Sequence, residues 1–196
     1  MIRRFKDSDI DELVSILNSD GVISVPTDTV FGVCARISSI AHDKLIAVKN
    51  RSFLKSFPIM CANVEQIESI AVLDDVSRKL IDFFMPGPIT LILKRKDGVS
   101  DYITNGKDTI AIRMATSKVI YDLLLRVGPV FMTSANQSGE PVCTNLDEIE
   151  KSCPLIDGML EGEVVFSCSS TIVDCTSGVK ILREGPISLS DIEEVL

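Results

Sequence analysis

The sequence is poor in the residues that most often carry acid–base and metal chemistry. It has a single histidine, His42, and its six cysteines form no C-x-x-C pair. A closed zinc site needs two paired ligand clusters, so we expect no structural metal. A catalytic cysteine usually has a histidine partner, and His42, next to Asp43 on the expected surface of a helix, is a poor candidate for that role.

The cysteines themselves indicate a reducing environment. Most of them lie in apolar runs, which is typical of buried thiols in a reducing compartment. Cys143 and Cys153 lie in more polar sequence and are the candidates for reactive thiols.

Positive charge and long apolar runs are also scarce. The chain has 20 lysines and arginines against 28 aspartates and glutamates, a net charge of −8. Binding nucleic acid through a broadly basic surface needs many more cations, but the net charge does not argue against a local basic cleft. There is no charged-then-apolar leader, and no apolar run approaches the roughly 20 residues that span a bilayer. We therefore expect a cytoplasmic protein that makes no membrane contact.

The length of 196 residues is enough for one domain with a sizeable core. A chain of this size buries roughly 70% of its unfolded surface. No internal repeat, low-complexity segment or linker composition divides the sequence. We expect a single domain over residues 1–196.

Apolar periodicity and capping residues predict mixed helices and strands. Helices are expected at residues 7–20, ended by a left-handed Gly21, and at 38–51, 63–70, 74–85, 117–127, 145–152 and from 190 onward. Strands are expected at residues 22–25, 59–62, 89–93, 109–115, 130–132, 164–166, 171–174 and 179–182.

Polar side chains follow two of these strands. Residues 22–25 lead through Pro26 into Thr27, Asp28 and Thr29, and residues 130–132 lead into the run TSANQSG at 133–139. Open α/β sheets bind ligands at the carboxyl ends of strands, and neutral donors there suit phosphate or carboxylate oxygens. The alternative for the first end is a capped turn in which Asp28 bonds its own backbone.

Three cations accompany these strand ends. Lys49 and Arg51 follow a predicted helix, where they either complement the helix C-terminus or form a cradle for anions. Arg113 lies among apolar residues of a predicted strand. An arginine in that setting is rarely unpaired, so it meets an internal carboxylate or faces a ligand anion.

Seven segments, in order and spacing, resemble the YrdC-type threonylcarbamoyl-adenylate synthases. They are PTDTVFG (26–32), KNR (49–51), PGPITLIL (86–93), TIAIR (109–113), TSANQSGEP (133–141), STIVD (170–174) and ILREG (181–185). Single pieces are weak signals, but seven in sequence over residues 21–186 are specific. The resemblance implies an α/β fold of the α+β type in three layers: a twisted mixed sheet of about seven strands, helices on both sides and an open cleft.

The resemblance also implies which residues bind substrates. The L-threonine-binding positions are Thr27, Thr29, Arg113, Ser134 and Ser170. The ATP-binding positions are Lys49, Arg51, Thr109, Asn136, Thr144 and Arg183. Lys49 and Arg51 are in addition the candidate catalytic residues, because their charges would neutralise phosphates. Mg²⁺ would enter with ATP.

Family members make the activated intermediate for the threonylcarbamoyl modification of the adenosine beside the tRNA anticodon. The implied reaction adds the threonine amine to CO2 from bicarbonate, and the new carboxylate then attacks the α-phosphorus of ATP and expels pyrophosphate. Threonylcarbamoyl-transferase proteins would receive the product, and contact with tRNA is a further option. Nothing in the sequence identifies a general base.

The sequence departs from the family pattern at several positions. Asp28 replaces the usual glutamate, Phe31 replaces the usual tyrosine, the loop after Arg51 lacks the common proline, and the histidine that many relatives have after Pro58 is absent. Three alternatives stay open: a module that binds double-stranded RNA or tRNA without synthase activity, a carbamoyl-transfer relative of hydrogenase maturation, and an inactive regulatory homologue.

Overall fold

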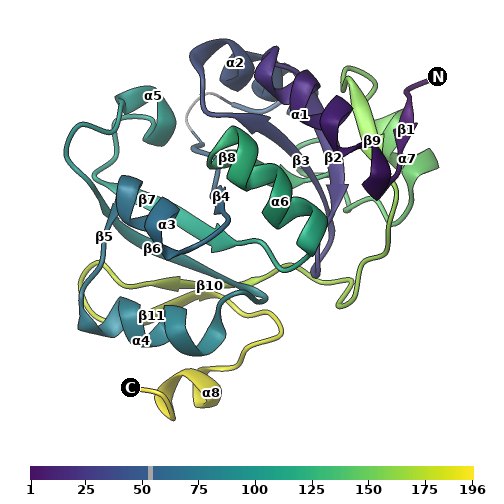
Figure 1. Cartoon of the computed structure of the whole chain (residues 1–196). Coiled ribbons are helices and arrows are strands. Elements are labelled where there is room, and N and C mark those ends of the chain that lie inside the picture. Colours follow the sequence, from purple (N-terminus) through teal and green to yellow (C-terminus); the bar gives the residue numbers. More distant parts are fainter. Residues whose placement is uncertain (53–54) are drawn as a thin grey trace.

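A single mixed sheet runs through the computed structural model, which describes residues 1–52 and 55–196 (Figure 1). The strands are β1 Arg4–Phe5, β2 Val22–Pro26, β3 Phe31–Arg36, β4 Ile59–Cys61, β5 Ala71–Val72, β6 Ile89–Arg95, β7 Thr109–Met114, β8 Val130–Ser134, β9 Gly158–Leu160, β10 Thr171–Asp174 and β11 Lys180–Arg183. Their spatial order is β1-β9-β2-β3-β8-β4-β7-β6-β10-β11, and β5 pairs with β6.

The helices lie outside this sheet. They are a 3-10 turn at Asp7–Asp9, α1 Ile10–Asn18, α2 Ser39–Lys49, α3 Val64–Ile70, α4 Asp75–Phe84, α5 Asp101–Thr104, α6 Lys118–Val127, α7 Leu146–Ser152 and α8 Leu189–Glu193. The predicted class of a mixed sheet with helices is confirmed. The sheet has 11 strands in the described residues, so the expectation of about seven was too low.

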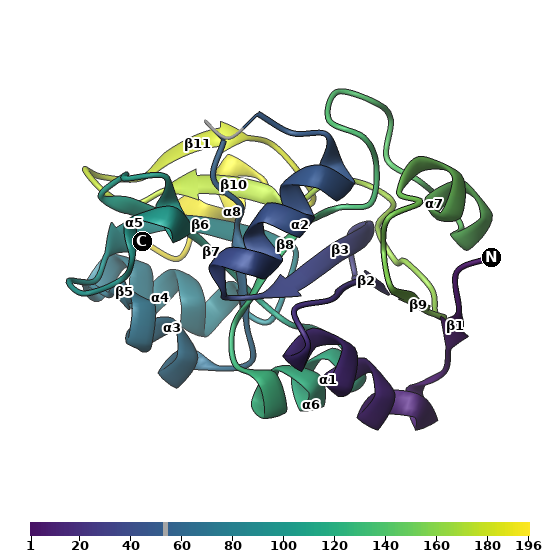
Figure 2. The same cartoon turned by 90° about the horizontal axis from the view of Figure 1, so that it is seen from above.

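Neighbouring residues of the central strands belong to two separate cores. In β4, Ile59 packs in one apolar cluster and Met60 in the other; in β8, Phe131 and Val130 divide in the same way. Successive strand residues point to opposite faces, so the sheet is apolar on both. Helices α1 and α6, side by side in Figure 2, cover one core, and α2, α3 and α4 contribute to the other.

β2 and β3 form an antiparallel hairpin, with register from Val22 opposite Ala35 to Pro26 opposite Phe31. The sequence predicted β2 but not β3. All residues of β3 up to Ala35 are buried, so no alternation of apolar and polar residues marks it as a strand. The polar turn after β2 therefore closes a hairpin rather than leading into a helix.

Two further expectations were wrong. Residues 164–166 are not a strand: Val165 and Phe166 are 74% and 46% exposed, whereas β9, which was not predicted, pairs in parallel with β1 and β2. The left-handed residue after α1 is Asp20 (φ 58°), not Gly21. Gly21 is needed for space, because a Cβ there would lie 2.5 Å from the Cγ2 of Ile16.

The other predicted helices and strands are confirmed, with shifts at their ends, while α5 and β5 were not predicted. Asn63 caps α3 as expected, since its side chain accepts a hydrogen bond from the amide of Gln66 at 3.0 Å. The loop after Arg51 includes residues 53–54, which lie outside the described residues. In the described ranges, no helix has the length and apolar character needed to cross a bilayer.

The structure corrects the expected surface position of His42 and shows where Cys143 and Cys153, the candidates for reactive thiols, lie. Both cysteines are buried, at 8% and 0% exposure, and Cys168 is the exposed thiol. His42 is only 5% exposed. Its ring packs against three aromatic rings, those of Phe57, Tyr102 and Phe131, at centroid distances of 5.6, 6.0 and 5.1 Å.

Burial lowers the pKa of His42, and Asp43, whose carboxylate is 3.7 Å from Nδ1, opposes this only in part. The unfolded chain, with a histidine pKa of about 6.5, binds the proton more readily than the folded chain. The contribution of His42 to the free energy of unfolding is therefore complete above pH 6.5, and it is lost as the pH falls toward the pKa of His42 in the folded chain. We expect the melting temperature to decrease from pH 7 to pH 5.5.

The His42→Leu variant, which removes the only imidazole, should show a flatter melting temperature over the same range. Differential scanning calorimetry of both proteins measures the difference. Equal slopes for the two proteins would assign the pH dependence to other groups.

Candidate functional site

A cavity of about 370 Å³ opens where the ends of several strands meet. Seven of the residues predicted to bind substrates line it: Thr27, Thr29, Arg51, Arg113, Ser134, Ser170 and Arg183. Because β3 is antiparallel to both β2 and β8, the carboxyl ends of β2 and β8 lie at the same edge of the sheet. The two polar strand ends noticed in the sequence therefore come together, as predicted.

The turn after β2 is organised by Thr27. Its hydroxyl donates to the carbonyl of Val30 at 2.6 Å and accepts from the amides of Thr29 and Val30 at 3.3 and 3.2 Å. The hydroxyls of Thr27 and Thr29 are 3.1 Å apart. Thr27, rather than Asp28 as the sequence suggested for a capped turn, bonds the local backbone. This leaves the Asp28 side chain available for another partner.

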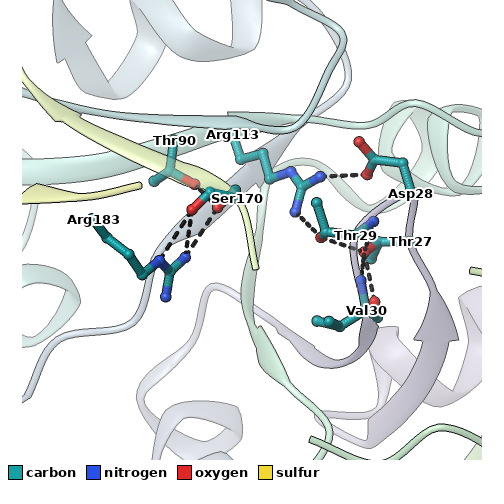
Figure 3. A network of polar contacts seen from close by, with 8 residues as sticks. All are labelled: Thr27, Asp28, Thr29, Val30, Thr90, Arg113, Ser170 and Arg183. Carbon is teal, nitrogen blue, oxygen red and sulfur yellow. Dashed lines mark hydrogen bonds and ion pairs between the residues drawn. The ribbon is translucent and has the colours of Figure 1, made fainter. Parts of the chain in front are cut away.

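Arg113, on β7, extends toward this turn and is 8% exposed (Figure 3). Its Nη1 donates to the Thr29 hydroxyl at 2.6 Å, and its Nη2 forms an ion pair with Asp28 Oδ1. Burial lowers the pKa of Arg113, and Asp28 opposes that shift. The sequence left open whether Arg113 meets an internal carboxylate or faces a ligand, and the structure allows both.

Arg183, on β11, approaches the cavity from the opposite side (Figure 3). Its Nε and Nη2 donate to the carbonyl of Ser170 at 3.0 and 2.9 Å, and the Ser170 hydroxyl lies 2.8 Å from that of Thr90. Gly185 allows this close approach, since a Cβ there would lie 2.4 Å from the amide nitrogen of Thr171.

Thr90 was not predicted as a site residue. It lies in one of the recognised segments, and a hydroxyl within an otherwise apolar strand was the signal available in the sequence. Ser56 and Ser169, which also line the cavity, carried no such signal.

Arg51 forms a third cationic wall. Its Nη2 donates to the carbonyl of Ser56 at 3.0 Å, and its guanidinium carbon lies 4.8 Å from the centroid of the Phe57 ring. Its Nε is buried and has no hydrogen-bond partner in the part of the chain that the structure describes. These contacts hold the guanidinium at the cavity and leave donor capacity for an anion.

Lys49 does not share this position, which corrects the expectation that Lys49 and Arg51 form one cradle. Its ammonium donates to the carbonyls of Ser134 and Asn136 and to the side-chain oxygen of Asn136, and it is 2% exposed. Burial lowers its pKa to about 8. Asn50, left-handed with φ 45°, ends α2 and turns the chain between the two cations. Lys49 and Asn136 thus brace the backbone behind Ser134.

Two other predicted ATP-binding residues lie away from the cavity walls. Thr109 is the first residue of β7 and pairs with Lys94. Thr144 precedes α7, where its amide and hydroxyl donate to Glu148 at 2.8 and 3.1 Å. It lines a separate hollow with Phe31 and Leu146.

Side chains suited to metal binding are sparse around this site. The described residues contain no group of three or more histidine, cysteine, aspartate or glutamate side chains that could hold a metal ion. The cavity walls combine guanidinium groups and hydroxyls, which bind anionic oxygens.

The fold and the site define an α/β protein with a cavity lined by guanidinium groups and hydroxyls. The model of the Sua5/YciO/YrdC family, which carries the description telomere recombination, matches residues 15–185. The chain belongs to this family, and the predicted family and fold class are confirmed.

Named relatives resemble the chain over most of its length. A protein of Methanocaldococcus jannaschii, provisionally named threonylcarbamoyl-AMP synthase, is 36% identical over 181 residues, 90% of this chain and 85% of the relative. The threonylcarbamoyl-AMP synthase of Photobacterium profundum is 31% identical over 182 residues, 90% of this chain and 98% of the relative. These names agree with the prediction of an enzyme.

A solved structure of Pyrococcus abyssi Sua5 complexed with L-threonine superposes with a TM-score of 0.92 and 27% identity. The alignment covers 100% of this chain and 61% of the Sua5 chain. The present chain therefore spans about three fifths of that longer protein.

The brace formed by Lys49 leads to a prediction about stability. In the Lys49→Met variant the carbonyls of Ser134 and Asn136 lose a charged donor inside the protein. We expect the free energy of unfolding to fall by about 3 kcal/mol, because buried acceptors left without donors are costly. Urea unfolding measures this loss.

The matched control is Lys118→Met, which removes an exposed lysine that pairs with Asp122 one helical turn away. Such pairs contribute about 0.5 kcal/mol or less. A Lys49→Met protein of wild-type stability that has lost only ATP use would instead make Lys49 a direct ATP ligand.

Proposed function

We propose that the protein is a threonylcarbamoyl-AMP synthase, which condenses L-threonine, bicarbonate or CO2, and ATP to threonylcarbamoyl-adenylate and pyrophosphate. The observation that carries the proposal is the meeting of Arg51, Arg113 and Arg183 in one cavity with several hydroxyl groups. The chain as a whole has a net charge of −8, so this cluster of cations is a local feature. It suits two anionic substrates held side by side.

The side chains divide between the two substrates. Arg113, with Thr29 beside it, suits the carboxylate of L-threonine, because a guanidinium can bind a carboxylate through two parallel hydrogen bonds. Arg51 and Arg183 suit the phosphates of ATP. Mg²⁺ would enter as part of the MgATP substrate, held by the phosphate oxygens.

The reaction would depend on placement more than on side-chain proton transfer. The neutral amine of threonine adds to CO2 and releases a proton to solvent; an oxygen of the resulting carbamate attacks the α-phosphorus as the bond to pyrophosphate breaks. Among the described residues, the cavity walls contain no aspartate, glutamate, histidine or cysteine. A water molecule there would find no general base, which favours the bound carbamate as the nucleophile.

Several wider expectations stay predictions. They are delivery of the product to threonylcarbamoyl-transferase proteins, direct contact with tRNA, and location in the cytoplasm. A carbamoyl-transfer activity would be recognised by turnover with carbamoyl phosphate in place of threonine and bicarbonate. An RNA-binding module would retain RNA on a filter whether or not ATP is present.

The proposal predicts pyrophosphate release that requires L-threonine, bicarbonate and Mg²⁺ together. The assay measures pyrophosphate and orthophosphate from ATP while each component is omitted in turn. Serine should be several-fold to about tenfold less effective, since one buried methyl contributes about 1 kcal/mol. Orthophosphate as the product, or pyrophosphate release that ignores threonine, would refute the synthase proposal.

A second prediction separates the two substrate subsites. Arg113→Lys should raise the apparent KM for threonine roughly ten- to a hundredfold, since lysine cannot form the two-bonded fork and charge-assisted hydrogen bonds contribute about 1.5–3 kcal/mol. The KM for ATP should change little. Steady-state kinetics with each substrate varied provide the measurement.

Arg51→Lys is the matched control, because it alters a guanidinium of the same cavity on the proposed phosphate side. It should raise the KM for ATP more than that for threonine. If Arg113→Lys raised the KM for threonine and the KM for ATP equally, Arg113 would be assigned to the internal ion pair alone.

A further inference from the structure

Asp28 contacts the proposed substrate site without forming part of the cavity wall. It lies in the turn after β2, and its side chain is 10% exposed, as is that of Arg113. Its Oδ1 pairs with Nη2 of Arg113, while its Oδ2 is buried and has no hydrogen-bond partner within the described ranges. A buried carboxylate in this state is costly unless its charge is paired, so the contact with Arg113 is what keeps it there.

The backbone of Asp28 is fixed independently. Its carbonyl accepts hydrogen bonds from the amides of Val165 and Phe166 at 3.1 and 2.8 Å. The segment that follows contributes Ser169 and Ser170 to the cavity. Asp28 is therefore held between the segment before β10 on one side and Arg113 on the other, and its carboxylate has little freedom to follow a moving guanidinium.

Arg113 is held from two directions by contacts that use two of its five N–H donors. Nη2 faces Asp28 and Nη1 faces Thr29 (Figure 3), whereas the Nε–H is buried and has no hydrogen-bond partner among the described residues. A buried donor without a partner is costly, so the contacts with Asp28 and Thr29 must offset that cost. In the described residues, Asp28 is the carboxylate in ion-pair contact with Arg113.

We propose that Asp28 is the positioning residue for Arg113: it fixes the direction of the guanidinium so that the remaining η hydrogens meet the carboxylate of the amino-acid substrate. This inference rests on the proposed function and adds a residue that determines affinity for the amino acid without touching it. Preorganising a fork of donors removes an ordering cost that binding would otherwise carry.

The length of the side chain is part of the inference. Asparagine at position 28 keeps the shape but removes the charge that holds Nη2. Glutamate keeps the charge and displaces the carboxylate by about one carbon–carbon bond, 1.5 Å. Because the Asp28 backbone is tied to residues 165 and 166, the turn cannot simply withdraw to absorb that extra length.

The test compares Asp28→Asn and Asp28→Glu with the wild-type protein and with a matched control. The control is Asp20→Asn, which alters a partly buried aspartate paired with Arg36 at the other end of the hairpin, in a left-handed conformation that asparagine tolerates. Measurements are kcat and KM for threonine and for ATP, L-threonine binding by calorimetry without turnover, and the melting temperature.

We expect Asp28→Asn to weaken threonine binding and raise its KM at least tenfold, with the KM for ATP changed less than twofold. Asp28→Glu should lie between Asp28→Asn and the wild type, and Asp20→Asn should match the wild type. In an Arg113→Lys background, Asp28→Asn should have little further effect on threonine, because the group that it positions is already gone.

Three results would overturn the inference: unchanged threonine binding in Asp28→Asn, equal increases in both KM values, or an effect of the same size in the Arg113→Lys background. A fall in melting temperature with unchanged threonine binding would make Asp28 purely structural. A wild-type protein that does not bind threonine would overturn the proposed function as well, whereas a change confined to the variants' binding tests Asp28 alone.

Discussion

A guanidinium buried at the end of a sheet strand must have its charge and its donors satisfied, and this requirement organises the site around Arg113. Asp28 supplies the charge and Thr29 an acceptor, and both come from the tight turn that Thr27 ties together. The turn can present them because the β2–β3 hairpin places it beside β8. Hairpin, turn and ion pair thus depend on one another.

The second feature of the site is that its arginines and its lysine have different positions. Arg51, Arg113 and Arg183 reach the cavity, each held by neighbouring oxygens or by a ring, while the ammonium of Lys49 is surrounded by backbone and amide oxygens. Arginine keeps its charge at such partly buried positions, and its planar fork binds carboxylates and phosphates. Lys49, whose pKa is lowered to about 8 by burial, serves instead as an internal brace through its contacts with Ser134 and Asn136.

The walls of the cavity fit the proposed reaction, in which two bound substrates react with each other. Hydroxyls and guanidinium groups can orient a carbamate and a triphosphate, and they stabilise charge that moves from one phosphate oxygen to another. The Nε atoms of Arg51 and Arg113 are buried and have no hydrogen-bond partner in residues 1–52 and 55–196.

The sequence alone determined the fold class, most helices and strands, the family and seven of the cavity residues, because periodicity, caps and ordered motifs are local signals. It could not determine β3, which is buried on both faces and so shows no alternation of apolar and polar residues, or β9, which is only three residues long. It also could not determine the burial of His42, which depends on three aromatic rings from other parts of the chain. Only the tertiary structure decided that Lys49 points inward while Arg51 lines the cavity, and that Asp28 pairs with Arg113. Those contacts join residues far apart in the chain, since the direction of a long side chain is set by what packs around it.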